Sequence, residues 1–278
     1  MKHSEFNCVS NDGLSLHFQI WQPADKIKGV VCVVHGHGEH LGRYEHVSKK
    51  LNDNGYALIG FDLRGHGKSE GKRGHSPSIS AFMDDIAMLL EKAHHEFVGI
   101  PLFIFGHSLG GTLVLNFMLR RKPNVLATIV TAPSLMPIFP IPKWKLSISR
   151  FLRIVLPTCP IPTGLTVSSL SRNHAVVEAY KKDALVHGLV TAKSGLDILE
   201  MGKWALQHAN EISLPLLLMH GTKDQLTSMQ ATEAFAKEVK NNCTLKLWEG
   251  FYHELHNEPE QEEVLTFLVS WLEKQIEK

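Results

Sequence analysis

Cysteine is scarce in this 278-residue sequence, and the four cysteines are not spaced as in a disulfide framework or a metal-binding motif: Cys8, Cys32, Cys159 and Cys243. No apolar run reaches the roughly 20 residues that a membrane-spanning helix needs, and the first residues carry no apolar segment typical of a secretory signal. The formal net charge is +1 without a basic block, which argues against a nucleic acid partner. We therefore expect a cytoplasmic protein with reduced thiols.

Short apolar, β-branched runs alternate with amphipathic helical patterns along most of the chain. Residues 29–34 and 57–61 are two such runs, and each ends in a glycine-rich loop, as expected for strands buried on both faces of a sheet. Further strands are expected at 102–105, 126–130, 214–219 and 244–248, and an edge hairpin at 5–22. Helices are expected at 43–54, 112–121, 229–240 and 260–276, and another is expected to begin at Ser80 as its N-cap residue. The sequence therefore predicts an α/β fold, with a mostly parallel central sheet flanked by helices.

The alternation of strands and helices breaks after Pro133. Seven prolines between residues 133 and 162 interrupt an apolar stretch, and short helical patterns follow at 174–182 and 193–208. Because the alternation resumes at residue 214, we interpret residues 134–212 as an inserted cap, or lid, and not as an independent domain. The core is then formed by residues 1–133 and 213–278.

Apolar side chains are concentrated at the start of this cap: Met136, Ile138, Phe139, Ile141 and Trp144. Such a segment at the edge of a sheet can enclose an apolar tunnel, and its outer face can touch a lipid surface. Alternatively, Phe139, Ile141 and Trp144 simply cover the sheet. The sequence thus leaves open a transient peripheral contact with a membrane, and it shows no second signal for stable anchoring.

The motif G-H-S-L-G at residues 106–110 lies between an expected strand and an expected helix. In this context G-x-S-x-G is typical of a nucleophile elbow, which holds a serine at positive φ at the tip of a tight turn. Small residues at 106 and 110 let the strand and helix backbones pass close to the serine. An ordinary glycine-rich turn would produce the same pattern, so the motif needs support from the rest of the chain.

Two further residues supply that support. Asp224 follows one expected strand and His253 follows the next, and the carboxyl ends of parallel strands meet at one edge of a sheet. A serine hydroxyl needs a base to become a nucleophile, and the base needs an orienting carboxylate. The alternatives are a turn carboxylate and a surface imidazole, but the order serine, aspartate, histidine is that of the α/β-hydrolases. The sequence therefore predicts a catalytic triad of Ser108, Asp224 and His253, with the backbone N–H groups of His37 and Leu109 as the oxyanion hole.

The loop H-G-H-G-E-H at residues 35–40 permits a rival interpretation. It resembles the H-x-H-x-D-H signature of metallo-β-lactamase-like hydrolases, in which imidazoles converge on metal ions. However, Glu39 stands where that signature has aspartate, and the chain lacks the strand-rich organisation of that fold. We therefore predict neither a metal nor another cofactor.

The chain also resembles the monoacylglycerol lipase group of the α/β-hydrolases over nearly its whole length. The resemblance rests on the motifs at residues 35–44, 62–71, 106–111, 220–224 and 252–256. It implies a serine ester hydrolase that cleaves monoacylglycerols or similar acyl esters through an acyl-enzyme, with a lysophospholipase or a general carboxylesterase as alternatives. It also implies that Glu39, Arg43 and His256 line a polar pocket for the glycerol head group. His37 stands where the family commonly has small residues, and it would narrow that pocket.

Overall fold

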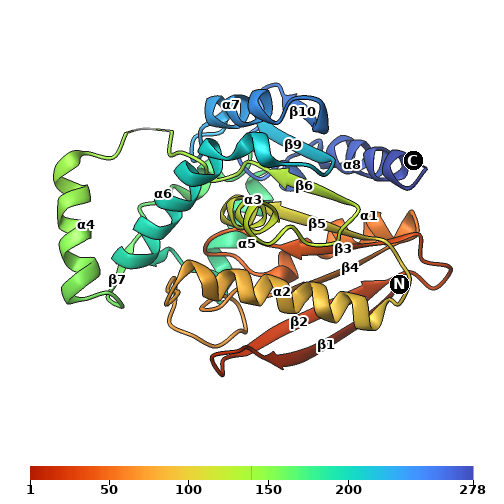
Figure 1. The fold of residues 1–278 in the computed structure, drawn as a ribbon, viewed down its shortest axis with the longest axis horizontal. Helices are drawn as coiled ribbons and strands as arrows, with labels where there is room; N and C mark the ends of the chain where they lie inside the picture. Colours follow the sequence, from red (N-terminus) through yellow and green to blue (C-terminus); the bar gives the residue numbers. More distant parts are fainter. Residues whose placement is uncertain (139, 278) are drawn as a thin grey trace.

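The computed structural model describes residues 1–138 and 140–277, so Phe139 of the expected apolar cap face lies outside the described residues. Eight strands form one sheet in the order β1-β2-β4-β3-β5-β6-β9-β10 (Figure 1). Their bounds are β1 (Lys2–Val9), β2 (Ser15–Gln22), β3 (Gly29–Val34), β4 (Tyr56–Phe61), β5 (Leu102–His107), β6 (Ala127–Thr131), β9 (Leu216–Gly221) and β10 (Cys243–Trp248). β2 pairs antiparallel with both β1 and β4, and every other pair of neighbouring strands in this sheet is parallel. The predicted edge hairpin and mostly parallel sheet are confirmed.

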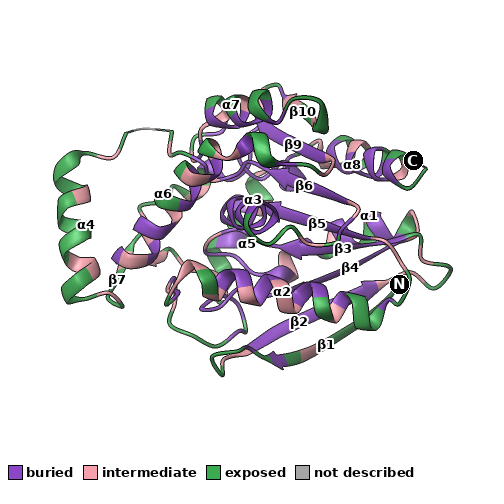
Figure 2. Ribbon diagram, viewed as in Figure 1, coloured by how far each residue is buried: buried purple, intermediate pink, exposed green. Residues whose placement is uncertain are grey.

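Strand β3 shows how the sheet is buried on both faces. Val30, Cys32 and Val34 pack into one hydrophobic core, whereas the alternate residues Val31 and Val33 pack into a second. The first core is covered by α2 (Ile79–Glu96), α3 (Leu109–Arg121), α6 (Ala192–Gln207) and α7 (Met229–Val239) and the second by α1 (Glu45–Asp53) and α8 (Gln261–Ile276). The central strands are accordingly buried along their length (Figure 2).

The start of α2 differs from the prediction by two residues. Ser78, not Ser80, is the N-cap, and its side chain accepts a hydrogen bond from the Ala81 N–H at 3.1 Å. Ser78 has an extended backbone, which aims its hydroxyl at the exposed N–H groups of the first turn, while Ser80 already lies inside the helix. The predicted cap at Ser80 was therefore wrong.

The cap contains α5 (His174–Lys182), as predicted, and α6, close to the expected bounds. It also contains two elements that the sequence analysis did not predict: helix α4 (Lys143–Val155) and a two-stranded antiparallel sheet formed by β7 (Pro160–Pro162) and β8 (Leu189–Thr191). Figure 1 shows α4 at one end of the molecule, on the outer side of α6. Arg153 of α4 holds it there by ion pairs with Asp197 and Glu200 of α6.

Short 3₁₀ helices complete the chain: η1 (Leu41–Tyr44), η2 (Val167–Ser169), η3 (Ala209–Glu211), η4 (Lys240–Asn242) and η5 (Leu255–Asn257). Among the described residues, no helix combines the length and apolar character needed to cross a bilayer. The chain leaves the sheet after β6 and returns at β9, so the cap lies at the carboxyl edge of the strands, where β5, β9 and β10 also end.

Candidate active site

Ser108 lies in the turn between β5 and α3 and has a φ of 52°. The two glycines of the motif make this strained turn possible. A Cβ on Gly106 would lie 2.4 Å from the Gly110 carbonyl oxygen, and a Cβ on Gly110 would lie 2.0 Å from the Val34 carbonyl oxygen. No larger residue fits at either position without a backbone shift, so these residues form the elbow that the sequence predicts.

The structure brings the three predicted triad residues together at the carboxyl edge of the sheet. The His253 Nε2 lies 2.9 Å from the Ser108 Oγ, and its Nδ1 lies 2.7 Å from the Asp224 Oδ2. All three side chains are almost fully buried. This is the hydrogen-bonded chain in which an imidazole can accept the serine proton while a carboxylate holds its tautomer.

Asp224 is held in place by more partners than the sequence analysis identified. Its Oδ1 accepts hydrogen bonds from the backbone N–H groups of Leu226 and Thr227, and its Oδ2 accepts one from the Thr227 hydroxyl. The His220 Nε2 also lies 3.1 Å from this Oδ2. Burial by itself raises the pKa of the Asp224 carboxyl, but His253 and His220 outweigh it and lower the pKa far below its usual range. The carboxylate is therefore ionised at neutral pH.

The pKa of His253 reflects two opposing influences. Burial lowers it, but the charge and hydrogen bond of the Asp224 carboxylate raise it above its ordinary value, with smaller contributions from Glu254 and Glu39. The negative charges around the ring thus stabilise the imidazolium that forms when His253 takes a proton.

The two predicted oxyanion donors come from different segments of the core. Leu109 is the first residue of α3, so its N–H has no acceptor within the helix and lies at the positive end of the helix dipole. His37 belongs to the loop after β3, and it lines the same cavity as Ser108. These positions keep both backbone groups available as the predicted donors.

A cavity of about 160 Å³, here named the catalytic cavity, lies beside Ser108 and His253. The core contributes Glu39, His107 and Thr227 to its wall, together with Gly36 and His37. The cap contributes its first residue, Ser134, and also Leu165, Leu170 and Tyr180. The cap therefore forms part of the wall around the reacting atoms.

Of the three predicted head-group residues, only Glu39 lines the catalytic cavity. The guanidinium of Arg43 donates instead to Glu39 at 2.8 Å and to both carboxylate oxygens of Glu254 at 2.7 Å. His256 is 1% exposed and stacks on Tyr44 with the ring centroids 4.8 Å apart. Ion pairing and stacking thus engage Arg43 and His256 outside the lining of the catalytic cavity, and their part in a head-group pocket stays a prediction.

Glu254 was missed by the sequence analysis, although it directly follows His253. Burial raises the pKa of its carboxyl, but the paired guanidinium of Arg43 outweighs this and lowers the pKa to about 2. Two carboxylates thus surround one guanidinium, and the group keeps one net negative charge beside the catalytic cavity. This charge disfavours an anionic head group next to it.

The side chains of the 35–40 loop do not converge on a common point. The His35 Nε2 accepts a hydrogen bond from the Leu63 N–H at 2.8 Å. The His37 Nε2 donates to the Leu189 carbonyl at 2.9 Å. The His40 Nε2 lies 2.8 Å from the Asp183 Oδ2. Within residues 1–138 and 140–277, no three His, Cys, Asp or Glu side chains are placed to share a metal ion. The geometry of the loop therefore gives no support to the metal-site interpretation.

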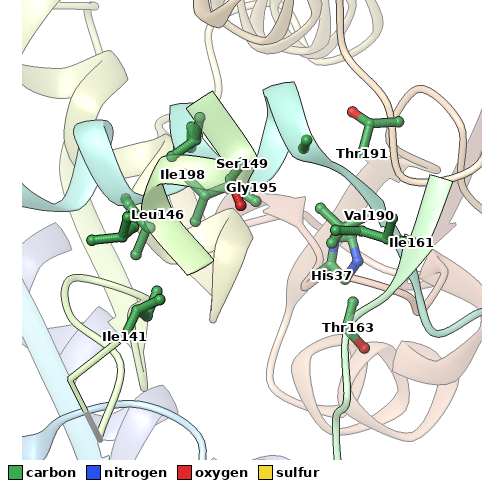
Figure 3. Close-up of a pocket in the computed structure, with 13 residues that line it drawn as sticks. His37, Ile141, Leu146, Ser149, Ile161, Thr163, Val190, Thr191, Gly195 and Ile198 are labelled. Atoms are coloured by element: carbon green, nitrogen blue, oxygen red, sulfur yellow. The ribbon is translucent and has the colours of Figure 1, made fainter. Parts of the chain in front are cut away.

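A second cavity of about 260 Å³ lies inside the cap, between α4, α6 and the β7–β8 sheet (Figure 3). Most of its wall is apolar, including Ile141, Leu146, Ile161, Val190, Leu196 and Ile198. We name it the apolar cap cavity. Ile141, which would cover the sheet under the alternative interpretation of the cap, instead faces this cavity.

The fold and the Ser-His-Asp arrangement are those of a serine hydrolase of the α/β-hydrolase class. A family described as "Serine aminopeptidase, S33" matches residues 25–260, and the chain belongs to this family. It is 32% identical to a monoacylglycerol lipase of Mycolicibacterium smegmatis over 97% of this chain and 96% of that protein. The crystal structure of a Paleococcus ferrophilus monoacylglycerol lipase matches with a TM-score of 0.86 and 32% identity, over 94% of this chain and 99% of that one.

An uncharacterized abhydrolase domain-containing protein of Dictyostelium discoideum is 37% identical over 100% of this chain. The chain spans only 30% of the length of that protein.

Proposed function

We propose that this enzyme hydrolyses monoacylglycerols to glycerol and a fatty acid through an acyl-enzyme on Ser108. The observation that carries the proposal is the hydrogen-bonded chain from Ser108 through His253 to Asp224, with distances of 2.9 and 2.7 Å. The similarity to monoacylglycerol lipases over nearly the full chain supports the choice of substrate.

The reaction follows from the positions of these groups. His253 removes the Ser108 proton as the Oγ attacks the ester carbonyl, and the N–H groups of His37 and Leu109 bind the resulting oxyanion. The imidazolium then gives its proton to the departing glycerol oxygen, which leaves the acyl group on Ser108. Water, deprotonated by His253, releases the fatty acid, so both half-reactions use the same base.

The net negative charge around Glu39 favours an uncharged glycerol head group over a phosphate. We expect kcat/KM for a monoacylglycerol to exceed that for lysophosphatidylglycerol of the same acyl length, whose head group carries one net negative charge, by at least about tenfold. The measurement compares both substrates with a p-nitrophenyl ester of that length. A preference for the lysophospholipid would replace the proposed substrate by the lysophospholipase alternative, and a preference for the simple ester would favour a general carboxylesterase.

The raised pKa of His253 predicts the pH dependence of the reaction. Only the neutral imidazole accepts the serine proton, so activity falls as the pH drops through the pKa of His253. Because that pKa lies above its ordinary value of 6.5, the acid limb of the kcat/KM profile should lie above pH 6.5. An uncharged monoacylglycerol is the suitable substrate, and circular dichroism at each pH controls for unfolding. An acid limb below pH 6 would contradict the assigned role of His253.

Helix α4 supports a second proposal, that the cap contacts lipid surfaces. None of its residues is buried, and Trp144 and Phe151 are 62% and 64% exposed. Together with Ile148 and Val155 they recur at the spacing of one helix face. Residues 143–155 also carry four basic and no acidic side chains. An apolar stripe with cations beside it is typical of helices that lie in the interface of an anionic membrane.

Replacing Trp144 and Phe151 by serine should reduce binding to anionic phospholipid vesicles by about tenfold or more, because two large apolar side chains leave the interface. Co-sedimentation with vesicles measures this binding. Turnover of a water-soluble short-chain ester should remain within about twofold and is the control. Unchanged vesicle binding by this variant would refute the proposed contact.

A further inference from the structure

His37 lines three cavities of the molecule. The catalytic cavity and the apolar cap cavity share no other residue among the described residues that line them. A third cavity of about 350 Å³ lies under the cap beside Tyr180, Asp183 and His187, and His37 lines it as well. His37 is therefore the one described residue that lines both of these cavities, and its imidazole lies among the residues of the apolar cap cavity (Figure 3).

This imidazole is braced from two directions. Its Nε2 donates to the Leu189 carbonyl of β8, which ties it to the cap. The rings of His66 and His187 pack edge-on against it, with centroids 5.2 and 5.5 Å away. Burial, followed by the neighbouring His187, lowers the pKa of His37 to about 4, so the ring is neutral at physiological pH. Moving it aside would leave the Leu189 carbonyl without this hydrogen bond.

We propose that the His37 side chain is the partition that closes the catalytic cavity off from the apolar cap cavity and thereby limits the length of the acyl chain. The inference rests on the proposed function, because it assigns the acyl group of the ester to this side of Ser108. A short acyl chain ends against the imidazole. A longer chain needs the apolar cap cavity, whose wall of aliphatic side chains suits methylene groups.

The test is the ratio of kcat/KM for p-nitrophenyl dodecanoate to that for p-nitrophenyl butyrate. Each methylene group of the acyl chain that moves from water into an apolar cavity should raise kcat/KM for that ester by about fourfold. Two such groups already raise it by more than about tenfold. His37→Ala removes the partition and should raise the ratio by at least tenfold. His37→Gln keeps an N–H donor for the Leu189 carbonyl and much of the bulk, and its ratio should stay within threefold of the wild type. The ratio within one variant cancels any general change in turnover.

A second substitution, at Gly195, tests whether the acyl chain of the substrate enters the apolar cap cavity. Gly195 of α6 lines the apolar cap cavity, and a Cβ built on it lies 3.8 Å from the nearest atom of Val190. Gly195→Leu therefore fills the cavity without a clash at the Cβ. Added to His37→Ala, it should abolish the gain for the dodecanoate ester, whereas in the wild-type background it should leave the ratio unchanged.

Three results would overturn the partition: an unchanged ratio in His37→Ala, a gain that persists when Gly195→Leu is added, or a reduced ratio in the single Gly195→Leu variant. The last result does not depend on the stability of any His37 variant. If the wild-type enzyme hydrolysed no ester at all, the proposed function would be refuted. Failure of the partition and failure of the proposed function are therefore distinguishable.

Discussion

Replacing Ser108 by alanine should lower ester turnover by about 10⁴- to 10⁶-fold. The Ser108 Oγ lies 2.9 Å from an imidazole that can accept its proton, so its removal eliminates the acyl-enzyme route. The oxyanion donors and the cavity remain, which leaves only the weak catalysis that binding and electrostatics supply. Turnover of a p-nitrophenyl ester measures the loss. Labelling by a fluorophosphonate probe, which reacts with activated serines, should disappear in the same variant.

Ser134 provides a matched control in the same cavity. Its hydroxyl lies 3.3 Å from the Ser108 Oγ, but no interaction among the described residues joins it to His253. Without a base it is a poor nucleophile, so Ser134→Ala should change turnover by less than about tenfold and retain the label. Near-normal activity of Ser108→Ala, or loss of labelling in Ser134→Ala alone, would show that the nucleophile is assigned to the wrong residue.

The sequence was most informative where one local rule determines the structure. Buried strands such as residues 29–34 are apolar at every position, which distinguishes a two-sided parallel sheet from an exposed one. Asp224 and His253 could be placed because the carboxyl ends of parallel strands meet at one edge, whatever the length of chain between them. The short G-x-S-x-G turn is recognisable because only glycine fits at residues 106 and 110.

The sequence was least informative where contacts join distant parts of the chain. Arg43 was expected in the cavity because it belongs to a motif, but its direction depends on Glu254, which is 211 residues away. Thr227 and His220 hold Asp224 through side-chain geometry that no spacing rule encodes. Helix α4 was missed because it buries none of its apolar residues in the core, and periodicity helps mainly when one face is known to be buried.

The arrangement around Asp224 predicts how the enzyme should respond to an isosteric change. In Asp224→Asn the side-chain oxygen must stay at the Oδ1 position, where it accepts the N–H groups of Leu226 and Thr227. The amide nitrogen then faces the Nδ1 of His253 and donates to it. The proton of the neutral imidazole moves to Nε2, which now points a donor at the Ser108 hydroxyl, so the ring no longer acts as a base. Turnover should fall by about 10⁴-fold while the fold is retained.

Asp183 is a control with nearly the same local geometry. Its Oδ1 accepts the Leu185 N–H at 2.8 Å and its Oδ2 lies 2.8 Å from the His40 Nε2, but this pair joins the cap to the core away from Ser108. Asp183→Asn should therefore reduce turnover by less than about tenfold. Steady-state kinetics should be measured for both variants, with melting temperatures to confirm that each is folded. The comparison separates the effect of losing the catalytic tautomer of His253 from the effect of losing any carboxylate near the cap. If Asp224→Asn lost no more activity than Asp183→Asn, His253 would not depend on Asp224 for its orientation.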